Sequence, residues 1–434
     1  MKKVLIITYY WPPSGGAAVQ RWLSFANKLS QKGWQVHLLT VDEKYATYQL
    51  RDESLKEQVD PNIKVHTTET KEPFKLFTSL FGKKSIPKPA FSNESNPSLL
   101  KKTFRFIRGN FFIPDPRKGW KKFAVTKAIE LIDSENIDRV ITAGPPHSTH
   151  FIGKQLKERK NIFWLVDFHD LWTDVIYYNQ LYHLPFIKKK DAQLERLILE
   201  SADLITTVGD KYKQKLLSKS SKISVDKVEI LRIGYEETLF DNVEPNQQNE
   251  FIITYTGSIA DFYKPEVFIQ ALKNVRGKFA DVPMKLRFVG VLSEGIKKQI
   301  INAGLENVLD AIDYVPHKQS VEFLKASTAL LLVNPVTKDE EMVIPGKVYE
   351  YLAAQKPIIN ITKRTSETAK IIEQANAGKT FDRQMQKELE NYLEGLIEKW
   401  KVSKNLDLSN KQNVFKYSRE AISSRLIDLL QRRK

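Results

Sequence analysis

Short apolar runs alternate with amphipathic stretches along almost the whole chain, and this alternation restricts the possible folds more than any other feature. Parallel strands need long crossover connections, which are usually helices, so the pattern predicts an α/β protein with parallel sheets. A first series of strands is expected at 3–8, 35–40, 63–67, 138–143, 163–167 and 204–208. A second series is expected at 251–256, 285–289, 313–315, 329–333 and 357–361.

The two series predict two Rossmann-like domains, because 434 residues exceed what one hydrophobic core usually organises. We expect an N-terminal domain at 1–235 and a C-terminal domain at 251–405, joined by the acidic, amide-rich linker 236–250. In the tail, 406–434, several apolar residues have helical spacing, which predicts a helix that docks back on the N-terminal domain. These residues are Val414, Phe415, Ile422, Leu426 and Leu430.

The positive charge is concentrated in one segment of the chain. The formal net charge is +16, and residues 71–127 contain fourteen Lys or Arg, three acidic residues and ten aromatic residues. Cations interleaved with aromatic rings suit the surface of an anionic membrane. A solvated insertion whose aromatic residues pack on the core remains an alternative. Nucleic acid is not expected as a partner, because no groove-reading or single-strand-binding module accompanies the charge.

Composition excludes several other classes of protein. The chain has no cysteine, so disulfide frameworks, thiolate catalysis and Cys-ligated metal sites are excluded. No run of 18 apolar residues occurs, so no membrane-spanning helix is expected. We therefore expect a cytoplasmic protein, with any membrane contact peripheral and at the inner face of the cell membrane.

A glycine pair follows the first expected strand and precedes an amphipathic helix. Gly15 and Gly16 would allow a ligand to approach the backbone beside a helix N-terminus, which attracts phosphate. The alternative is a turn that needs glycine only for its dihedral angles. The loop does not read GxGxxG, so a nicotinamide site has weak support.

A second candidate anion site lies in the C-terminal half. Pro345 suits the first turn of a helix, and Lys347 adds a cation to the positive end of that helix. Glu350, one turn later, could accept two hydrogen bonds from a diol such as a ribose. An ordinary surface glutamate is the alternative interpretation.

His169 and Asp170 follow the strand expected at 163–167, where they could orient a hydroxyl group or accept its proton. The alternative is a helix-capping Asp170 with a packed His169. His147 and His150 lie three positions apart without nearby acidic residues, so no metal site is expected there.

Taken together, these segments resemble the retaining GT-B glycosyltransferases of the family-four type, particularly the branch that acts in surface-polysaccharide assembly. The segment 344–359 looks like the donor-nucleotide signature of that family, in which Glu350 would hold the ribose. Met342 occupies the position of another family glutamate, with Glu341 one residue away. Lys264 matches a lysine that binds the donor diphosphate, and Ser258 stands where the family has an arginine.

The resemblance implies transfer of a hexose or N-acetylhexosamine from a nucleoside diphosphate sugar to a lipid-linked or polysaccharide acceptor. It implies catalytic roles for His169, Asp170 and Lys264, and donor contacts for Gly15, Gly16, Ser258, Lys264, Glu341, Gly346, Lys347 and Glu350. No two aspartates lie two positions apart, so the metal-binding DxD motif is absent and neither a metal nor another cofactor is expected. A nucleotide-sugar epimerase and a non-catalytic nucleotide-sugar-binding scaffold are the alternatives.

Overall fold

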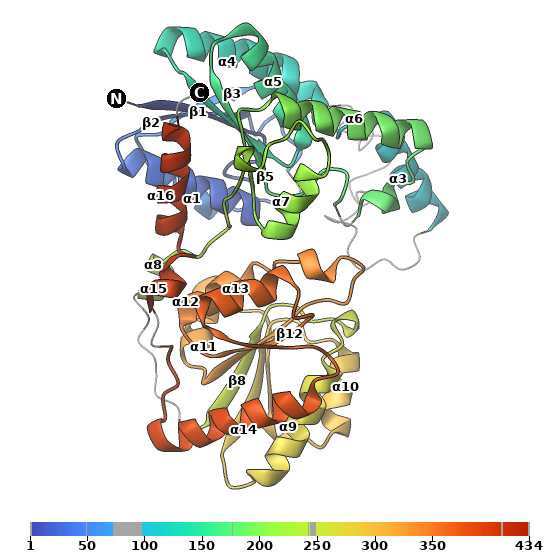
Figure 1. Cartoon of the computed structure of the whole chain (residues 1–434), viewed down its shortest axis with the longest axis vertical. Helices are drawn as coiled ribbons and strands as arrows, with labels where there is room; N and C mark the ends of the chain where they lie inside the picture. Colours follow the sequence, from blue (N-terminus) through green and yellow to red (C-terminus); the bar gives the residue numbers. More distant parts are fainter. Residues whose placement is uncertain are drawn as a thin grey trace. The chain divides into compact units, whose positions relative to one another are not determined.

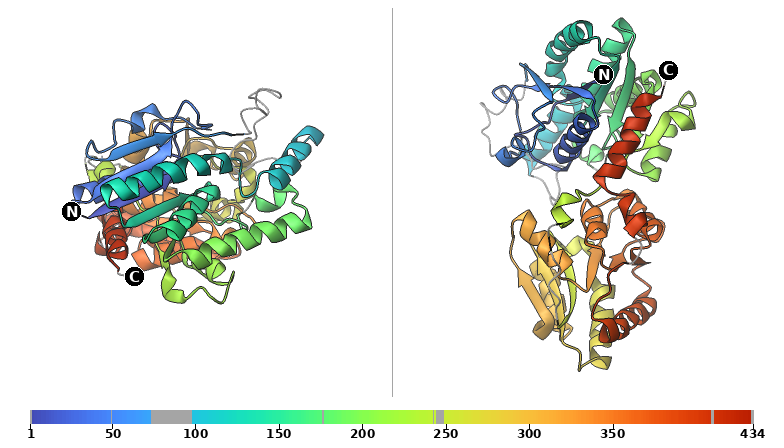
Figure 2. Two further views of the ribbon diagram at one scale, coloured as in Figure 1. Left: turned by 90° about the horizontal axis from the view of Figure 1, so that it is seen from above. Right: turned by 90° about the vertical axis from the view of Figure 1, so that its left-hand side faces the viewer.

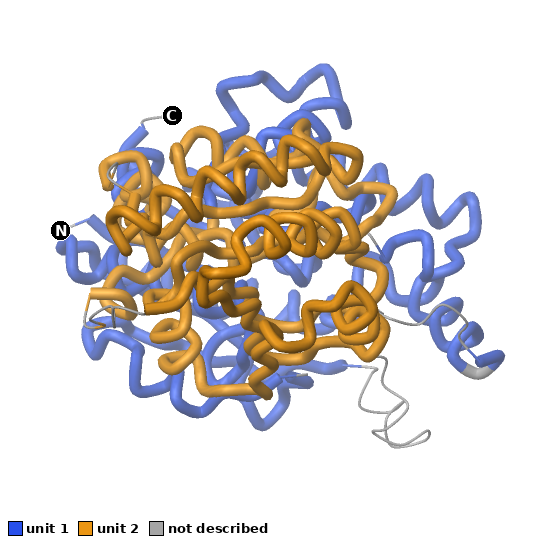
Figure 3. Tube along the Cα trace, turned by 90° about the horizontal axis from the view of Figure 1, so that it is seen from below, with its two compact units in different colours: residues 1–232, 423–434 blue, residues 233–422 orange. Residues whose placement is uncertain are grey.

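The computed structural model describes residues 2–48, 50–72, 98–175, 177–241, 243, 249–408 and 411–432. The chain divides into two compact units (Figure 3). Unit 1 comprises Met1–Arg232 and Ser423–Lys434, and unit 2 comprises Ile233–Ile422. No helix in the described ranges is long and apolar enough to cross a membrane.

Unit 1 contains a seven-stranded parallel sheet in the order β3-β2-β1-β4-β5-β6-β7. The central strands are buried along almost their whole length, as expected for strands covered on both faces. The strands are β1 (Lys3–Thr8), β2 (Gln35–Val41), β3 (Lys64–Thr68), β4 (Arg139–Gly144), β5 (Phe163–Phe168), β6 (Leu204–Thr207) and β7 (Val228–Ile230). The α-helices are α1 (Ala17–Gln31), α3 (Leu99–Phe111), α4 (Lys121–Glu135), α5 (His150–Arg159), α6 (Pro185–Ser201) and α7 (Asp210–Leu217). Short 3-10 helices are η1 (Glu53–Leu55), η4 (Lys118–Trp120), η5 (His147–Thr149), η6 (Tyr178–Leu181) and η7 (Val225–Lys227).

Unit 2 contains a six-stranded parallel sheet in the order β10-β9-β8-β11-β12-β13. The strands are β8 (Phe251–Thr256), β9 (Met284–Val289), β10 (Leu309–Ile312), β11 (Ala329–Val333), β12 (Ile358–Ile361) and β13 (Gly378–Phe381). The α-helices are α8 (Thr238–Asp241), α9 (Glu266–Lys278), α10 (Glu294–Asn302), α11 (His317–Lys325), α12 (Lys347–Ala354), α13 (Glu367–Ala375), α14 (Gln386–Ser403) and α15 (Lys411–Phe415). Short 3-10 helices are η8 (Asp261–Tyr263), η9 (Glu306–Val308) and η10 (Glu340–Met342).

The sheet of unit 2 separates two hydrophobic cores, with α9 and α14 on one face and α11, α12 and α13 on the other (Figure 1). Successive side chains of a strand point to opposite faces, so neighbours in β11 enter different cores. Leu331 packs with the α9 and α14 side, whereas Leu330 and Leu332 pack with the α12 side.

The two parallel sheets confirm the predicted α/β class with two Rossmann-like domains. The strand predicted at 313–315 is wrong, because β10 ends at Ile312 and residues 313–314 are exposed. Strands β7 and β13 were not predicted from the sequence. All three of these strands lie at the edges of their sheets, where less side-chain area is buried and the apolar signal is weaker.

Parts of two predicted segments lie outside the described residues. In the basic segment 71–127, residues 73–97 are not described, and the rest includes α3, η4 and the start of α4. In the segment 236–250, residues 242 and 244–248 are not described, and Phe240 of α8 is buried in a core of unit 2.

The last helix, α16 (Arg419–Gln431), begins in unit 2 and ends in unit 1. Its C-terminal part returns to the sheet of unit 1, where Nε of Arg139 on β4 donates to the carbonyl of Leu430 (3.0 Å). Arg425 and Arg432 both pair with Glu229 on β7. The red helix in Figure 2 shows this return of the chain.

A buried ion pair joins the first helix of unit 1 to its sheet. The guanidinium of Arg21 on α1 donates to both carboxylate oxygens of Asp167 at the end of β5 (2.5 and 3.1 Å), and both side chains are fully buried. Asp167 also accepts from Trp22 and Thr206, and Arg21 donates to the carbonyl of Leu231. The loop between β1 and α1 is therefore held beside the end of β5.

Replacing Asp167 by asparagine should destabilise unit 1 strongly, because Arg21 would remain as an uncompensated buried charge. We expect Asp167→Asn to lower the free energy of unfolding by about 3–5 kcal/mol. Urea unfolding followed by tryptophan fluorescence will measure it, since six of the seven tryptophans lie in unit 1.

The matched control is Asp133→Asn, which removes an exposed carboxylate paired with Lys160. Its expected effect is below about 1 kcal/mol. Equal effects of the two substitutions would contradict a structural role for the buried pair.

Candidate functional site

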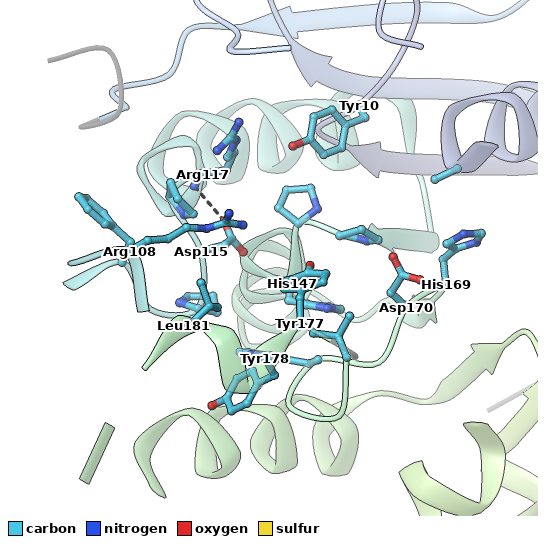
Figure 4. A pocket seen from close by; sticks show the side chains of 18 of the residues that line it. Tyr10, Arg108, Asp115, Arg117, His147, His169, Asp170, Tyr177, Tyr178 and Leu181 are labelled. Atoms are coloured by element: carbon cyan, nitrogen blue, oxygen red, sulfur yellow. Dashed lines mark hydrogen bonds between the residues drawn. The ribbon is translucent and has the colours of Figure 1, made fainter. Parts of the chain in front are cut away.

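A cavity of about 380 Å³ lies in unit 1 at the carboxyl end of the sheet (Figure 4). Its lining includes Gly15 and Gly16 after β1, His147 after β4, and His169 and Asp170 after β5. The strands β1 and β4 are neighbours at the point where the strand order reverses, which is where open α/β sheets bind ligands. Four residues predicted from the sequence therefore share one cavity.

The glycine loop has a backbone conformation that favours glycine, and it also lines the cavity. Gly16 has a φ of 114° immediately before α1, a conformation that favours glycine. The amide of Gly15 donates to the carbonyl of Leu50 (3.1 Å), which anchors the loop. Residues 17–19, whose N–H groups have no intrahelical acceptor, line the cavity. The loop thus needs glycine for its backbone and also presents a helix N-terminus to the cavity.

Two cations of the basic segment, Arg108 of α3 and Arg117, also line this cavity. Asp115 lies between them in sequence and accepts from the amide and hydroxyl of Ser148 (2.7 and 2.8 Å) and from the amide of Arg117 (2.9 Å). The Arg117 guanidinium donates to the carbonyl of Thr47 (3.0 Å). Asp115 therefore organises the cavity wall, a role that the sequence analysis did not predict.

Burial keeps the histidines of the cavity neutral at pH 7. It lowers the pKa of His147 to about 3, and it lowers the pKa of His169 against the opposing charge of Asp170. Nδ1 of His169 has no hydrogen-bond partner in the part of the chain that the structure describes. Nδ1 is itself buried, so it can accept a hydrogen bond from an incoming hydroxyl group only where it becomes exposed to the ligand.

The helix-capping alternative for Asp170 is wrong, because the next helical segment in the described chain is η6, which begins at Tyr178. Asp170 instead lies beside His169 at the edge of the cavity (Figure 4).

Helix α6 contributes Asp191 to the cavity wall. Asp191 is 2% exposed and accepts from Nε1 of Trp172 (2.9 Å) and from the hydroxyl of Tyr178 (2.8 Å), both of which line the cavity. One turn later, Glu195 accepts from the hydroxyl of Thr173 (2.5 Å). Burial raises the pKa of Asp191 to about 6, although both hydrogen bonds favour its ionised form.

In unit 2 the strand order reverses between β8 and β11, and the predicted Lys347 reaches the end of β8. Its Nζ donates to the hydroxyl of Tyr255 (2.7 Å) and to the carbonyl of Thr256 (2.8 Å). The Tyr255 hydroxyl donates to the carbonyl of Ser258 (3.0 Å), so Ser258 and Lys347 share a partner. Burial lowers the pKa of Lys347 to about 8.

The other predicted residues of α12 surround its first turn. Gly346 precedes the helix without a side-chain cap, and a Cβ at this position would meet nothing within 4 Å. Oε1 of Glu350 lies 2.8 Å from Nε2 of His317, and this hydrogen bond raises the pKa of His317. A carboxylate has about four lone-pair sites, so Glu350 can bind a diol while keeping this partner.

Lys264 lies in the segment between β8 and α9. It is exposed and has a φ of 51°, and its side chain makes no hydrogen bond or ion pair with any residue that the structure describes. Its ammonium group is therefore available to an anionic ligand.

Glu340, not Glu341 or Met342, is the buried residue of η10. Its carboxylate accepts from the hydroxyl of Thr362 (2.9 Å) and from Nη1 of Arg383 (2.7 Å). Glu341 is partly exposed and lies 3.4 Å from Nζ of Lys363. Glu340 and Arg383 were not predicted from the sequence, because only the contact between these two distant segments indicates that they pair.

No group of three or more His, Asp or Glu side chains suited to a metal ion occurs within the residues described. The residues of the two candidate sites provide cations, amides and neutral imidazoles, a donor set that suits an anionic ligand with hydroxyl groups.

Residues 236–413 match the family model described as "Glycosyl transferases group 1". No curated protein sequence matches the chain significantly. The structure is similar over 99% of its length to a glycosyltransferase from Rickettsia africae ESF-5, with 16% sequence identity, a TM-score of 0.62 and 98% of that chain covered.

Two further solved structures resemble the chain over 99% of its length. Anabaena HepE, crystallised in complex with UDP, is 12% identical, with a TM-score of 0.61 and 99% of that chain covered. Sucrose-phosphate synthase from Thermosynechococcus elongatus is 14% identical, with a TM-score of 0.56 and 98% of that chain covered. These similarities show that the chain has the GT-B fold.

The raised pKa of Asp191 predicts an unusual pH dependence of stability. Between the ordinary pKa of 3.8 and about 6, the folded chain binds a proton that the unfolded chain has released. Wild type should therefore lose about 2 kcal/mol of stability relative to Asp191→Asn as the pH rises from 4 to 7. Urea unfolding at both pH values will measure this difference. A pH-independent difference would contradict it.

Proposed function

We propose that the chain is a glycosyltransferase that moves a hexose or N-acetylhexosamine from a nucleoside diphosphate sugar to a hydroxyl group of its acceptor. The observation that carries the proposal is the cation site at the end of β8, which lies within the region that matches the group 1 glycosyl transferases. A UDP complex among the similar structures is consistent with a nucleotide donor.

The donor diphosphate would bind at this edge of unit 2. Lys347 lies against the end of β8, Lys264 has a free ammonium group, and the first N–H groups of α12 have no side-chain cap. Preorganised cations and amides of this kind stabilise the negative charge that develops on a leaving diphosphate. Glu350 would hold the ribose, while Ser258 and Glu341 would contribute to the donor contacts.

The acceptor would bind in the cavity of unit 1. Its polar lining and the neutral His169 beside Asp170 suit a sugar hydroxyl group that must be oriented and relieved of its proton. Gly15 and Gly16 would bring the first turn of α1 close to the reacting groups. We further propose that transfer retains the configuration of the sugar. The acceptor would be lipid-linked or a polysaccharide, and the enzyme would act in surface-polysaccharide assembly.

Transfer is favoured over the two other candidate functions. The family match is to transferases and gives no support to a nucleotide-sugar epimerase. Isomerisation of a free nucleotide sugar would reveal such an epimerase. Binding of a nucleotide sugar without turnover of any donor would favour the non-catalytic scaffold.

Membrane contact through the basic segment 71–127 is part of the proposal. Its residues 98–127 carry exposed lysines, such as Lys101 and Lys102 on α3, and exposed aromatic side chains, such as Phe111. Such surfaces bind anionic headgroups. We propose a cytoplasmic enzyme that contacts the inner face of the cell membrane peripherally.

Substitutions in the donor site should weaken nucleotide binding without unfolding unit 2. Loss of a charge-assisted hydrogen bond costs about 1.5–3 kcal/mol, so Lys264→Ala and Glu350→Ala should each lower transfer about 10- to 150-fold. Binding of UDP and GDP, measured as a thermal shift with wild type and both variants, will show which base is recognised and whether its affinity falls.

The matched controls are Lys297→Ala and Glu294→Ala on α10 of the same unit. Near-normal turnover in both donor-site variants, or equal losses in the controls, would refute this assignment of the donor site.

Transfer should not depend on a divalent cation, because lysines and helix N–H groups would neutralise the diphosphate. We expect EDTA to leave the rate of sugar transfer unchanged. The rate with EDTA, and after adding back manganese or magnesium, will test this. A rate that vanishes with EDTA and returns with manganese would contradict the proposed mechanism.

A further inference from the structure

Exposed apolar side chains gather on two neighbouring segments of unit 1, which together we call the docking surface: α3 and residues 182–190. Leu99 is 80% exposed, Phe111 is 67% exposed and Phe186 is 66% exposed, and Tyr182 and Leu184 are also exposed. Single exposed apolar residues are ordinary, but a concentration of this kind marks an interaction surface.

The two segments form one continuous surface because the backbone of α3 packs directly on the chain before α6. The side chain of Asn110 donates to the carbonyl of Tyr182 (3.2 Å) and accepts from the amide of Leu184 (2.8 Å). A Cβ at Gly109 would lie 2.3 Å from the carbonyl oxygen of Leu181, so only glycine permits this approach. In Figures 1 and 2, α3 and the start of α6 lie at the same end of unit 1.

The charge of the docking surface has a single sign. The sequences 98–112 and 177–190 contain no Asp or Glu. Their exposed lysines are Lys101, Lys102, Lys188, Lys189 and Lys190. The next acidic residue in the sequence, Asp191, is buried and lines the cavity. Exposed rings and aliphatic side chains among cations are complementary to a layer of anionic headgroups over acyl chains.

We propose that the docking surface binds the face of an anionic phospholipid bilayer. Lipid binding itself does not depend on the proposed function. Only its biological purpose rests on that function, because both segments of the docking surface also contribute to the cavity assigned to the acceptor. Arg108 and Gly109 of α3, together with Leu181 and His183, line that cavity. An acceptor anchored in the bilayer would therefore reach the cavity directly beside the contact with lipid.

Vesicle flotation with the full chain tests the docking surface. Wild type should bind vesicles of phosphatidylglycerol and phosphatidylcholine, bind much less to phosphatidylcholine alone, and dissociate as salt rises. Lys189→Glu/Lys190→Glu should lower the partition coefficient by about tenfold or more. Phe111→Ser/Phe186→Ser tests the apolar contribution, with the thermal unfolding midpoint as its folding control.

The matched control is Lys297→Glu/Lys298→Glu on α10, which makes the same change in net charge on exposed lysines of unit 2. It should change the partition coefficient by less than about twofold if the docking surface provides the contact. Equal loss in this control, equal binding of wild type to neutral and anionic vesicles, or no binding would overturn the proposal. Tighter binding to single-stranded DNA than to anionic vesicles would assign the surface to nucleic acid and also overturn it.

The UDP and GDP thermal-shift assay separates this proposal from the proposed function. Vesicle binding without any nucleotide binding would refute the glycosyltransferase proposal and leave the docking surface intact. Nucleotide binding without vesicle binding would refute the docking surface and the membrane contact, and would leave the proposed donor site intact.

Discussion

Reversal of strand order within a parallel sheet is the constraint on which both candidate sites depend. Crossovers leave in opposite directions from β1 and β4 in unit 1, and from β8 and β11 in unit 2. The loops after these strands cannot cover one another, so the carboxyl edge stays open where they diverge. In unit 1 this edge holds the cavity, and in unit 2 it holds Lys347 at the end of β8.

Buried strands were predicted most accurately, although the exposed edge strand β3 was also predicted to within one residue. The strands β1, β8 and β11 occupy the residues predicted for them. Strands that are covered on both faces consist of nearly continuous apolar residues, which are easy to recognise in a sequence. The edge strands β7 and β13 went unpredicted, and β10 was placed a few residues too late. Their partly exposed faces admit polar residues, so the apolar pattern alone cannot mark them.

Four residues that line the cavity of unit 1 were predicted because they come soon after strands. Gly15, Gly16, His169 and Asp170 each come a few residues after a buried run, and they line one cavity. Arg108 and Asp191 reach the same cavity from helices far away in sequence, and no local pattern indicates that contact. The same holds for Glu340 and Arg383, whose ion pair joins η10 to the chain after β13.

The path of the last helix has a consequence for the order in which the protein can form. Unit 2 is inserted between β7 and the end of α16, so unit 1 contains both the earliest and the latest residues of the chain. During synthesis, Arg139 and Glu229 are translated before unit 2. Their partners on α16, Leu430, Arg425 and Arg432, are translated only after it. The inserted unit can therefore complete its fold on the ribosome before α16 is complete, whereas its host acquires this helix only afterwards.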